Sequence, residues 1–134
     1  MSLNVPNTAE IIMLQYILGL TSPGNKILRL YKNDPSISDS TVLGGLTECT
    51  EAGYAPVTLY SISWTISQDM SGVTTALYSE MPFNFTTGAT VYGYYITSAV
   101  GGNLLWVERF SGAPYQLPAS GGGQIGVEAR TTLD

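Results

Sequence analysis

Residues 90–110 read TVYGYYITSAVGGNLLWVERF, with the pair Gly101-Gly102 just past the middle of the stretch. Aromatic and β-branched residues are enriched in strands, and two successive glycines supply the backbone freedom of a tight hairpin turn. The stretch therefore predicts two strands, over residues 90–98 and 103–110, that pair as an antiparallel hairpin.

Strict alternation along the first of these strands separates its tyrosines. Tyr92 and Tyr94 share one face with Ile96, while Tyr95 points to the other face. A half-buried sheet explains Tyr92 and Tyr94 as core residues. We expect Tyr95 to be open for an interface, where side chains with one apolar and one polar end are favoured.

Shorter alternating segments lie on both sides of this hairpin. The cleanest, SISWTISQ over residues 61–68, predicts that Ile62, Trp64 and Ile66 point inward from one strand. Two long segments, 33–45 and 111–123, are rich in Pro, Gly or Ser and predict irregular loops. Many short strands with frequent turns indicate an all-β fold, a jelly-roll or β-sandwich of about eight short antiparallel strands. The other strands are expected at residues 26–32, 57–60, 73–79, 81–85 and 124–131.

One short helix is expected near the N-terminus, over residues 8–19. Asn7 can cap this helix, and Glu10 three residues later completes a capping box. Apolar residues from Ile11 to Leu20 cover more than one side, so we expect the helix to bury most of its circumference. It would do so either by plugging the open end of the sheets or by docking on a neighbour. The chain then forms a single domain over residues 1–134, with the helix and its lead-in at 1–24 and the β-sandwich at 25–134.

The composition limits the possible partners. Charged residues make up only 11% of the chain and the net charge is −5, whereas about a quarter of the residues are charged in an average globular domain. The five basic residues are too few and too dispersed for a nucleic-acid binder. Three of them fall within residues 26–32, where a solvated strand edge explains them.

Neither a signal peptide nor a membrane-spanning run is recognisable, so the protein is expected to be soluble.

The residues that catalysis needs are scarce. The chain has no histidine, so it has no Ser-His-Asp triad and no Cys-His pair. The lone cysteine, Cys49, is expected to be a buried small apolar residue. Glu108 and Glu128 remain as a formal carboxylate pair of the glycosidase type. Outward-facing charges that pair across strands, with Arg109 and Arg130 beside them, explain both residues more simply. We therefore expect no enzymatic activity and no cofactor.

Hard oxygen ligands suited to calcium occur in the 33–45 segment. Their spacing matches no EF-hand, and solvation of a loop explains them, so no metal site is expected. The residues concerned are Asn33, Asp34, Ser36 and Asp39.

A series of short motifs gives the chain a resemblance to a known family. They are VPN followed by Glu10, LRLY at 28–31, an Asn-Asp-Pro loop, Gly-Tyr-Ala at 53–55, SWTIS at 63–67, VYGYY at 91–95 and LLWVERF at 104–110. Over nearly its whole length the chain resembles small virion proteins of tailed bacteriophages, some of which serve as capsid cement or decoration proteins. The motifs are strand sequences rather than chemical signatures.

This resemblance implies a jelly-roll-like domain, often trimeric, that lies on the outside of the capsid and clamps neighbouring major capsid proteins. Such a protein is made in the host cytoplasm and then becomes part of the virion. The residues that we expect at the interface are Tyr16, Asp34, Asp39, Tyr95 and Tyr115.

A second function fits the same β scaffold. A carbohydrate-binding module of a tail or fibre tip would stack sugar rings on aromatic side chains. The candidates for stacking are Tyr54, Tyr60, Trp106 and Tyr115.

Overall fold

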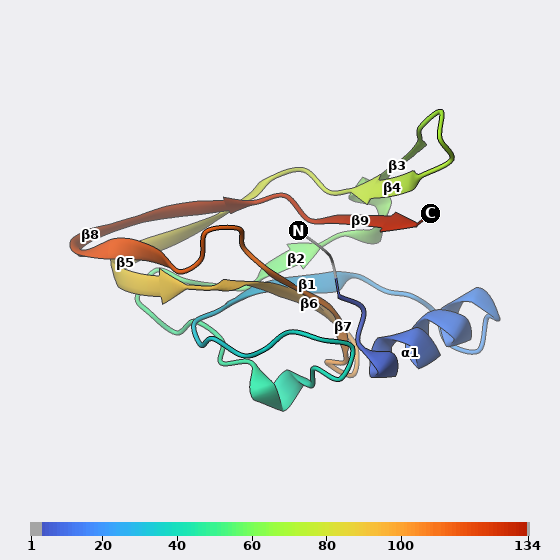
Figure 1. Cartoon of the computed structure of the whole chain (residues 1–134), viewed down its shortest axis with the longest axis horizontal. Helices are drawn as coiled ribbons and strands as arrows, with labels where there is room; N and C mark the ends of the chain where they lie inside the picture. Colours follow the sequence, from blue (N-terminus) through green and yellow to red (C-terminus); the bar gives the residue numbers. More distant parts are fainter. Residues whose placement is uncertain (1–3, 134) are drawn as a thin grey trace.

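The computed structural model describes residues 4–133, which are dominated by antiparallel strands (Figure 1). The all-β class and its single short α-helix are confirmed over these residues. The helix is α1 (Asn7–Ile17). The described strands are β1 (Lys26–Tyr31), β2 (Val57–Leu59), β3 (Thr65–Gln68), β4 (Thr74–Leu77), β5 (Met81–Val91), β6 (Gly93–Ser98), β7 (Leu104–Arg109), β8 (Tyr115–Val127) and β9 (Arg130–Leu133).

The strands form three antiparallel groups. The largest is a four-stranded sheet in the order β2-β1-β6-β7, and the others are β3-β4-β9 and the long pair β5-β8. The predicted hairpin is present as β6 and β7, which pair directly, although Thr90 and Val91 belong to β5. The expectation that Tyr92 shares a face with Tyr94 is wrong, because Tyr92 packs against the other cluster.

The expectation that residues 26–32 form a solvated edge is wrong, because β1 lies between β2 and β6. Its Arg29 is matched instead by Glu48, and Lys32 by Glu51.

The four-stranded sheet is buried on both faces. Leu28 and Leu30 of β1 belong to the main core together with Phe83 and Phe85 of β5. The opposite face carries a smaller cluster that contains Tyr31, Val107, Leu104 and Leu46. All six residues of β6 are buried for this reason.

Tyr95 belongs to the second cluster and is only 3% exposed, so its expected place at an open interface is wrong. The segment between β1 and β2 covers this face, with Leu46 in the cluster and Ile37 packed against it. Asn33 fastens the segment, because its side chain donates to the carbonyl of Gly45 and accepts from the amide of Thr47. The predicted 33–45 loop therefore forms one wall of the core.

Strands β5 and β8 form a long two-stranded arm at one end of the molecule (Figure 1). The turn expected at residues 86–88 is absent, since β5 continues through it, and most of the loop expected at 111–123 belongs to β8. Irregular register steps interrupt the pairing between Phe85 and Ala89. A Cβ on Gly122 would lie 2.1 Å from the carbonyl oxygen of Phe85. Glycine is needed there because the two backbones approach too closely for a side chain.

The predicted inward row in residues 61–68 is wrong. Residues 61–63 form a short 3₁₀ turn rather than a strand, and Ile62 is 94% exposed. Ile66 on β3 is also 71% exposed. Trp64 alone reaches the core, where its ring meets Tyr78 at 5.2 Å and Trp106 at 6.0 Å between centroids. The small sheet β3-β4-β9 has no second layer over β3, all of whose residues are exposed.

Trp64→Ala should lower the free energy of unfolding by about 2–3 kcal/mol, because Trp64 is a partly buried ring whose removal leaves a gap between Tyr78 and Trp106. Ile62→Ala is the matched control and should change stability by less than about 0.5 kcal/mol, as expected for an exposed side chain. Urea denaturation followed by circular dichroism measures both. Equal losses for the two variants would contradict this packing.

Helix α1 is more exposed than its sequence predicts. It begins at Asn7 with Pro6 as the N-cap residue and no side-chain cap, so the expected capping box is absent. Ala9 is its only buried residue among those described, and Ile12 and Met13 pack partly against the core. The helix therefore does not plug the end of the sheets, which was one of the two expected ways of burying its circumference. The large side chains left 60–80% exposed are Ile11, Leu14, Ile17, Leu18 and Leu20.

Candidate functional site

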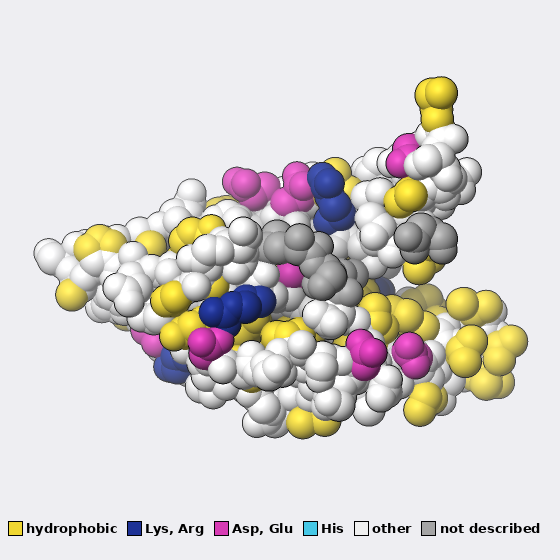
Figure 2. Space-filling model, viewed as in Figure 1, with side chains coloured by type: hydrophobic (Ala, Val, Ile, Leu, Met, Phe, Trp, Pro, Cys, Tyr) yellow, Lys and Arg dark blue, Asp and Glu magenta, His cyan; other side chains and the backbone are white. Residues whose placement is uncertain are grey.

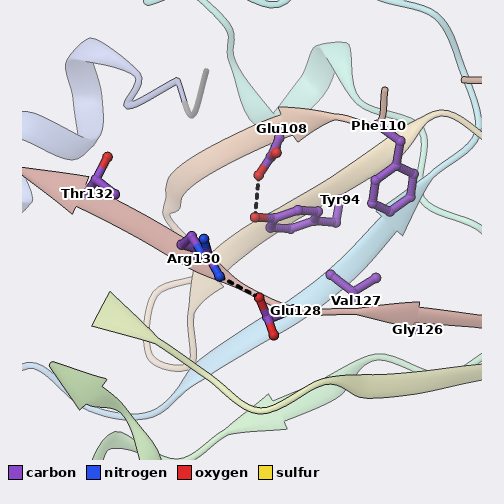
Figure 3. A pocket seen from close by; sticks show the side chains of 8 residues that line it. All are labelled: Tyr94, Glu108, Phe110, Gly126, Val127, Glu128, Arg130 and Thr132. Atoms are coloured by element: carbon purple, nitrogen blue, oxygen red, sulfur yellow. Dashed lines mark hydrogen bonds and ion pairs between the residues drawn. The ribbon is translucent and has the colours of Figure 1, made fainter. Parts of the chain in front are cut away.

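A pocket of about 540 Å³ opens where the ends of β7 and β8 meet the start of β9 (Figure 3). Strand β6 supplies its floor through Tyr94, and the segment after β7 supplies Phe110. The pocket combines aromatic side chains with two carboxylates and one guanidinium. Its lining residues are Tyr94, Glu108, Phe110, Gly126, Val127, Glu128, Arg130 and Thr132.

Glu108 is the buried charged group of this pocket, with only 8% of its surface exposed. It stands opposite Tyr94 in the β6–β7 register. The Tyr94 hydroxyl donates a hydrogen bond of 2.5 Å to Glu108 Oε2 (Figure 3). Burial raises the pKa of Tyr94, and the hydrogen bond and charge of Glu108 act in the same direction. The hydroxyl therefore stays protonated and remains a donor to the carboxylate.

The expectation that Glu108 points outward and pairs across strands is wrong for this reason. Arg109, the next residue, turns away and forms an ion pair with Asp34. The guanidinium of Arg109 also lies 5.2 Å from the ring centroid of Tyr92. Glu108 and Arg109 alternate across the sheet, so only Arg109 is on the side of the 33–45 segment.

Glu128 and Arg130 form an exposed ion pair of 3.0 Å on the rim of the pocket. They are two residues apart on the same stretch of chain, so the expected pairing across strands is replaced by a local one. The pocket thus brings Glu108 and Glu128 to one place, as a carboxylate pair would require. Their surroundings differ, however, because Glu108 is buried against a tyrosine and Glu128 is exposed beside an arginine.

A second carboxylate–tyrosine pair lies between β1 and the segment before β2. Glu48 accepts from the Tyr54 hydroxyl at 2.9 Å and from Arg29, whose Nη1 lies 2.9 Å from each carboxylate oxygen. Burial raises the pKa of Tyr54, although the amide of Leu30 that donates to its hydroxyl opposes this shift. The group is complete, since acid, phenol and guanidinium all have partners.

The other predicted interface residues are not brought together with the pocket residues. Tyr16 is half-buried on α1, and Asp39 is exposed in the segment before β2. Asp34 is exposed and paired with Arg109, rather than arranged with other oxygens around a cation. Among residues 4–133 there is no group of three or more acidic or cysteine side chains that could hold a metal ion. Tyr115 is exposed at the start of β8 and its hydroxyl donates to the carbonyl of Ser111.

The aromatic residues considered for sugar stacking divide into two groups. Trp106 is buried in the core, and Tyr54 is stacked on Phe83 and Phe85, so neither offers a free ring face. Tyr60 and Tyr115 are exposed. Trp106 lies on β7 rather than in a loop, whereas Tyr54 lies in the segment before β2 with its ring packed against the core.

Cys49 is confirmed as a buried residue, with 1% of its surface exposed. Burial raises the pKa of its thiol to about 12, and the charge of Glu51 adds to this effect. A thiol of this kind stays protonated near neutral pH and is a poor nucleophile.

Exposed apolar side chains gather at one end of the molecule, over α1 (Figure 2). Further apolar residues project from the hairpin of β3 and β4, where Met70 lies at the tip. Glu10 is the only charged residue within α1. The sequence predicted a core position for Ile62 and Ile66 of this surface, which is wrong.

No known protein family matches the chain, and no curated protein matches it either. Within residues 4–133, no helix is both long and apolar enough to cross a membrane.

Proposed function

We propose that this chain is a structural protein of a tailed-bacteriophage virion, a capsid cement protein that binds the outer capsid lattice and stabilises it. The proposal includes a jelly-roll-like arrangement of the strands and a homotrimer as the active unit. The observation that carries it is the unpaired apolar surface of α1, in a chain whose sequence resembles such virion proteins.

The surface of α1 has the chemistry of a lasting protein contact. Large aliphatic residues that are 60–80% exposed lie on one short helix and in the three residues that follow it. Patches of this kind mark surfaces that another protein covers. Glu10 is the only charged residue on the helix. Burying the helix surface against a partner therefore requires little desolvation of charged groups.

The rest of the surface supports binding through many shallow contacts. The exposed residues of the 33–45 segment, including Asp39, and of the β8 strand, including Tyr115, belong to different edges of the molecule. A protein that contacts several subunits of a repeating lattice gains avidity from such contacts without one deep site. We expect these edges to touch neighbouring capsid subunits.

Particles that lack this protein should assemble but lose their genome at a lower temperature than complete particles. Adding the purified protein should restore the original temperature, because lattice contacts are re-formed without new assembly. Heating the particles with a DNA-binding dye measures the release temperature. Depleted particles with unchanged heat stability would contradict the cement function.

The adhesin alternative is tested by the same particles. If depleted particles are equally heat-stable and fail to adsorb to the host, a tail location is supported. Electron microscopy then distinguishes density over the whole shell from density confined to the tail.

A further inference from the structure

We propose that the pocket between β7, β8 and β9 binds a guanidinium group, supplied by an arginine side chain of a partner protein. The guanidinium binds the Glu108 carboxylate, which already accepts a hydrogen bond from Tyr94. The aliphatic part of the arginine side chain lies along an aromatic wall formed by Phe110 and Tyr115. The partner's identity rests on the proposed function, whereas binding of the cation is a property of the free protein.

The first argument is the unmatched charge of Glu108. The side chain is more than nine-tenths buried, yet among the described residues it has no cationic partner. Its Oε2 accepts from Tyr94, and no described residue donates to Oε1. The one guanidinium in the pocket, that of Arg130, is held by Glu128. A buried carboxylate of this kind favours an incoming cation.

The second argument is the completed group elsewhere in the chain. Glu48 accepts from a tyrosine hydroxyl, as Glu108 does. In addition, both carboxylate oxygens of Glu48 accept from Nη1 of Arg29. The pocket therefore contains the acid and the phenol of that group but lacks the guanidinium. Arginine is well suited to such a place because its planar head can bond a carboxylate and stack on rings.

The third argument is the shape of the approach. A second hollow of about 320 Å³ shares Phe110 and Gly126 with the pocket and is lined also by Tyr115. The rings of Phe110 and Tyr115 meet edge to face at 5.7 Å. Figure 3 shows Phe110 beside Tyr94 on the same side of the pocket. An arginine stem can cover such an apolar wall while its charged head reaches the carboxylate.

The test uses N-acetyl-arginine amide as the probe and N-acetyl-citrulline amide as its uncharged analogue of similar shape. Backbone amide shifts of Gly126, Val127 and Arg130 are followed by NMR at constant ionic strength. The arginine probe should give saturable shifts with a dissociation constant on the order of millimolar. The citrulline probe should bind at least tenfold more weakly, because it lacks the charge that Glu108 attracts.

Glu108→Gln should weaken arginine binding at least tenfold, because it removes the charge with which the guanidinium pairs. Glu10→Gln, on α1 and outside the pocket, removes the same charge and should have no effect. If Glu108→Gln does not fold, Phe110→Leu should still weaken binding severalfold. Equal binding of citrulline and arginine, or unchanged binding in a folded Glu108→Gln, would overturn the proposal. Tighter binding of spermidine than of the arginine probe would overturn the assignment to a protein side chain.

These results separate the pocket from the cement function. If the probe fails to bind but the protein still restores the heat stability of particles, only the proposal of an arginine-binding pocket is refuted. If the probe binds but the protein does not stabilise particles, only the proposed cement function is refuted.

Discussion

Gly93→Ala is expected to destabilise the fold severely. Gly93 begins β6 between β1 and β7, opposite Tyr31 on one side and Arg109 on the other. A Cβ at this position would lie 2.1 Å from the carbonyl oxygen of Glu108 and 2.5 Å from the hydroxyl of Tyr31. These two atoms are hydrogen-bonded to each other, so neither can move away without breaking that bond.

The expected loss is about 3 kcal/mol or more, since overpacking of a backbone contact is relieved only by separating the strands. A loss of that size is a large part of the roughly 5–15 kcal/mol that stabilises an ordinary domain. Urea denaturation followed by tryptophan fluorescence measures it. Gly44→Ala is the control, because nothing lies within 4 Å of its Cβ position. Equal midpoints for the two variants would show that β6 is not enclosed in this way.

The second large effect concerns particle binding. The double variant Leu14→Ser and Ile17→Ser should fold normally, since both side chains are exposed on α1. Its apparent affinity for depleted particles should fall by at least about a hundredfold, because two apolar contacts are lost in each of several bound copies. Sedimentation with particles measures binding, and light scattering measures the expected loss of association in solution.

Leu133→Ser is the matched control, because Leu133 is similarly exposed but lies on β9. It should bind particles as the natural protein does. A double variant that still binds and associates normally would show that α1 is not covered in the assembly.

Local patterns predicted the central strands well. Leu28 and Leu30 alternate with Arg29 in β1, and the glycine pair at 101–102 separates β6 from β7 as expected. The pairing of Tyr94 with Glu108 could not have been found by counting outward from that turn. The count places Arg109 opposite Tyr94, and it does not account for the register shift between Ile96 and Thr97. The charge of Glu108 and its neighbour Arg109 suggested a surface position, although a tyrosine hydroxyl can satisfy a buried acid.

The burial of other side chains depended on which segment covers their face of a sheet. Alternation of apolar and polar residues in the sequence does not predict that. Ile62 and Ile66 have the spacing of a core row, but no second layer faces them. Tyr95 has the spacing of an open face, but the segment before β2 covers it. The glycines of residues 121–123 indicate a loop in isolation, whereas here Gly122 allows the backbones of β5 and β8 to meet.

The segment between β1 and β2 has a consequence for attaching peptides or enzymes to this protein. Its length and polar composition suggest a place for insertion, yet its side chains close one face of the four-stranded sheet. The tip of the β3–β4 hairpin is the better graft point. There the Asp69 carboxylate already orders the turn by accepting from the amides of Ser71 and Val73, and Met70 projects into solvent. A guest sequence at that tip is displayed away from the core.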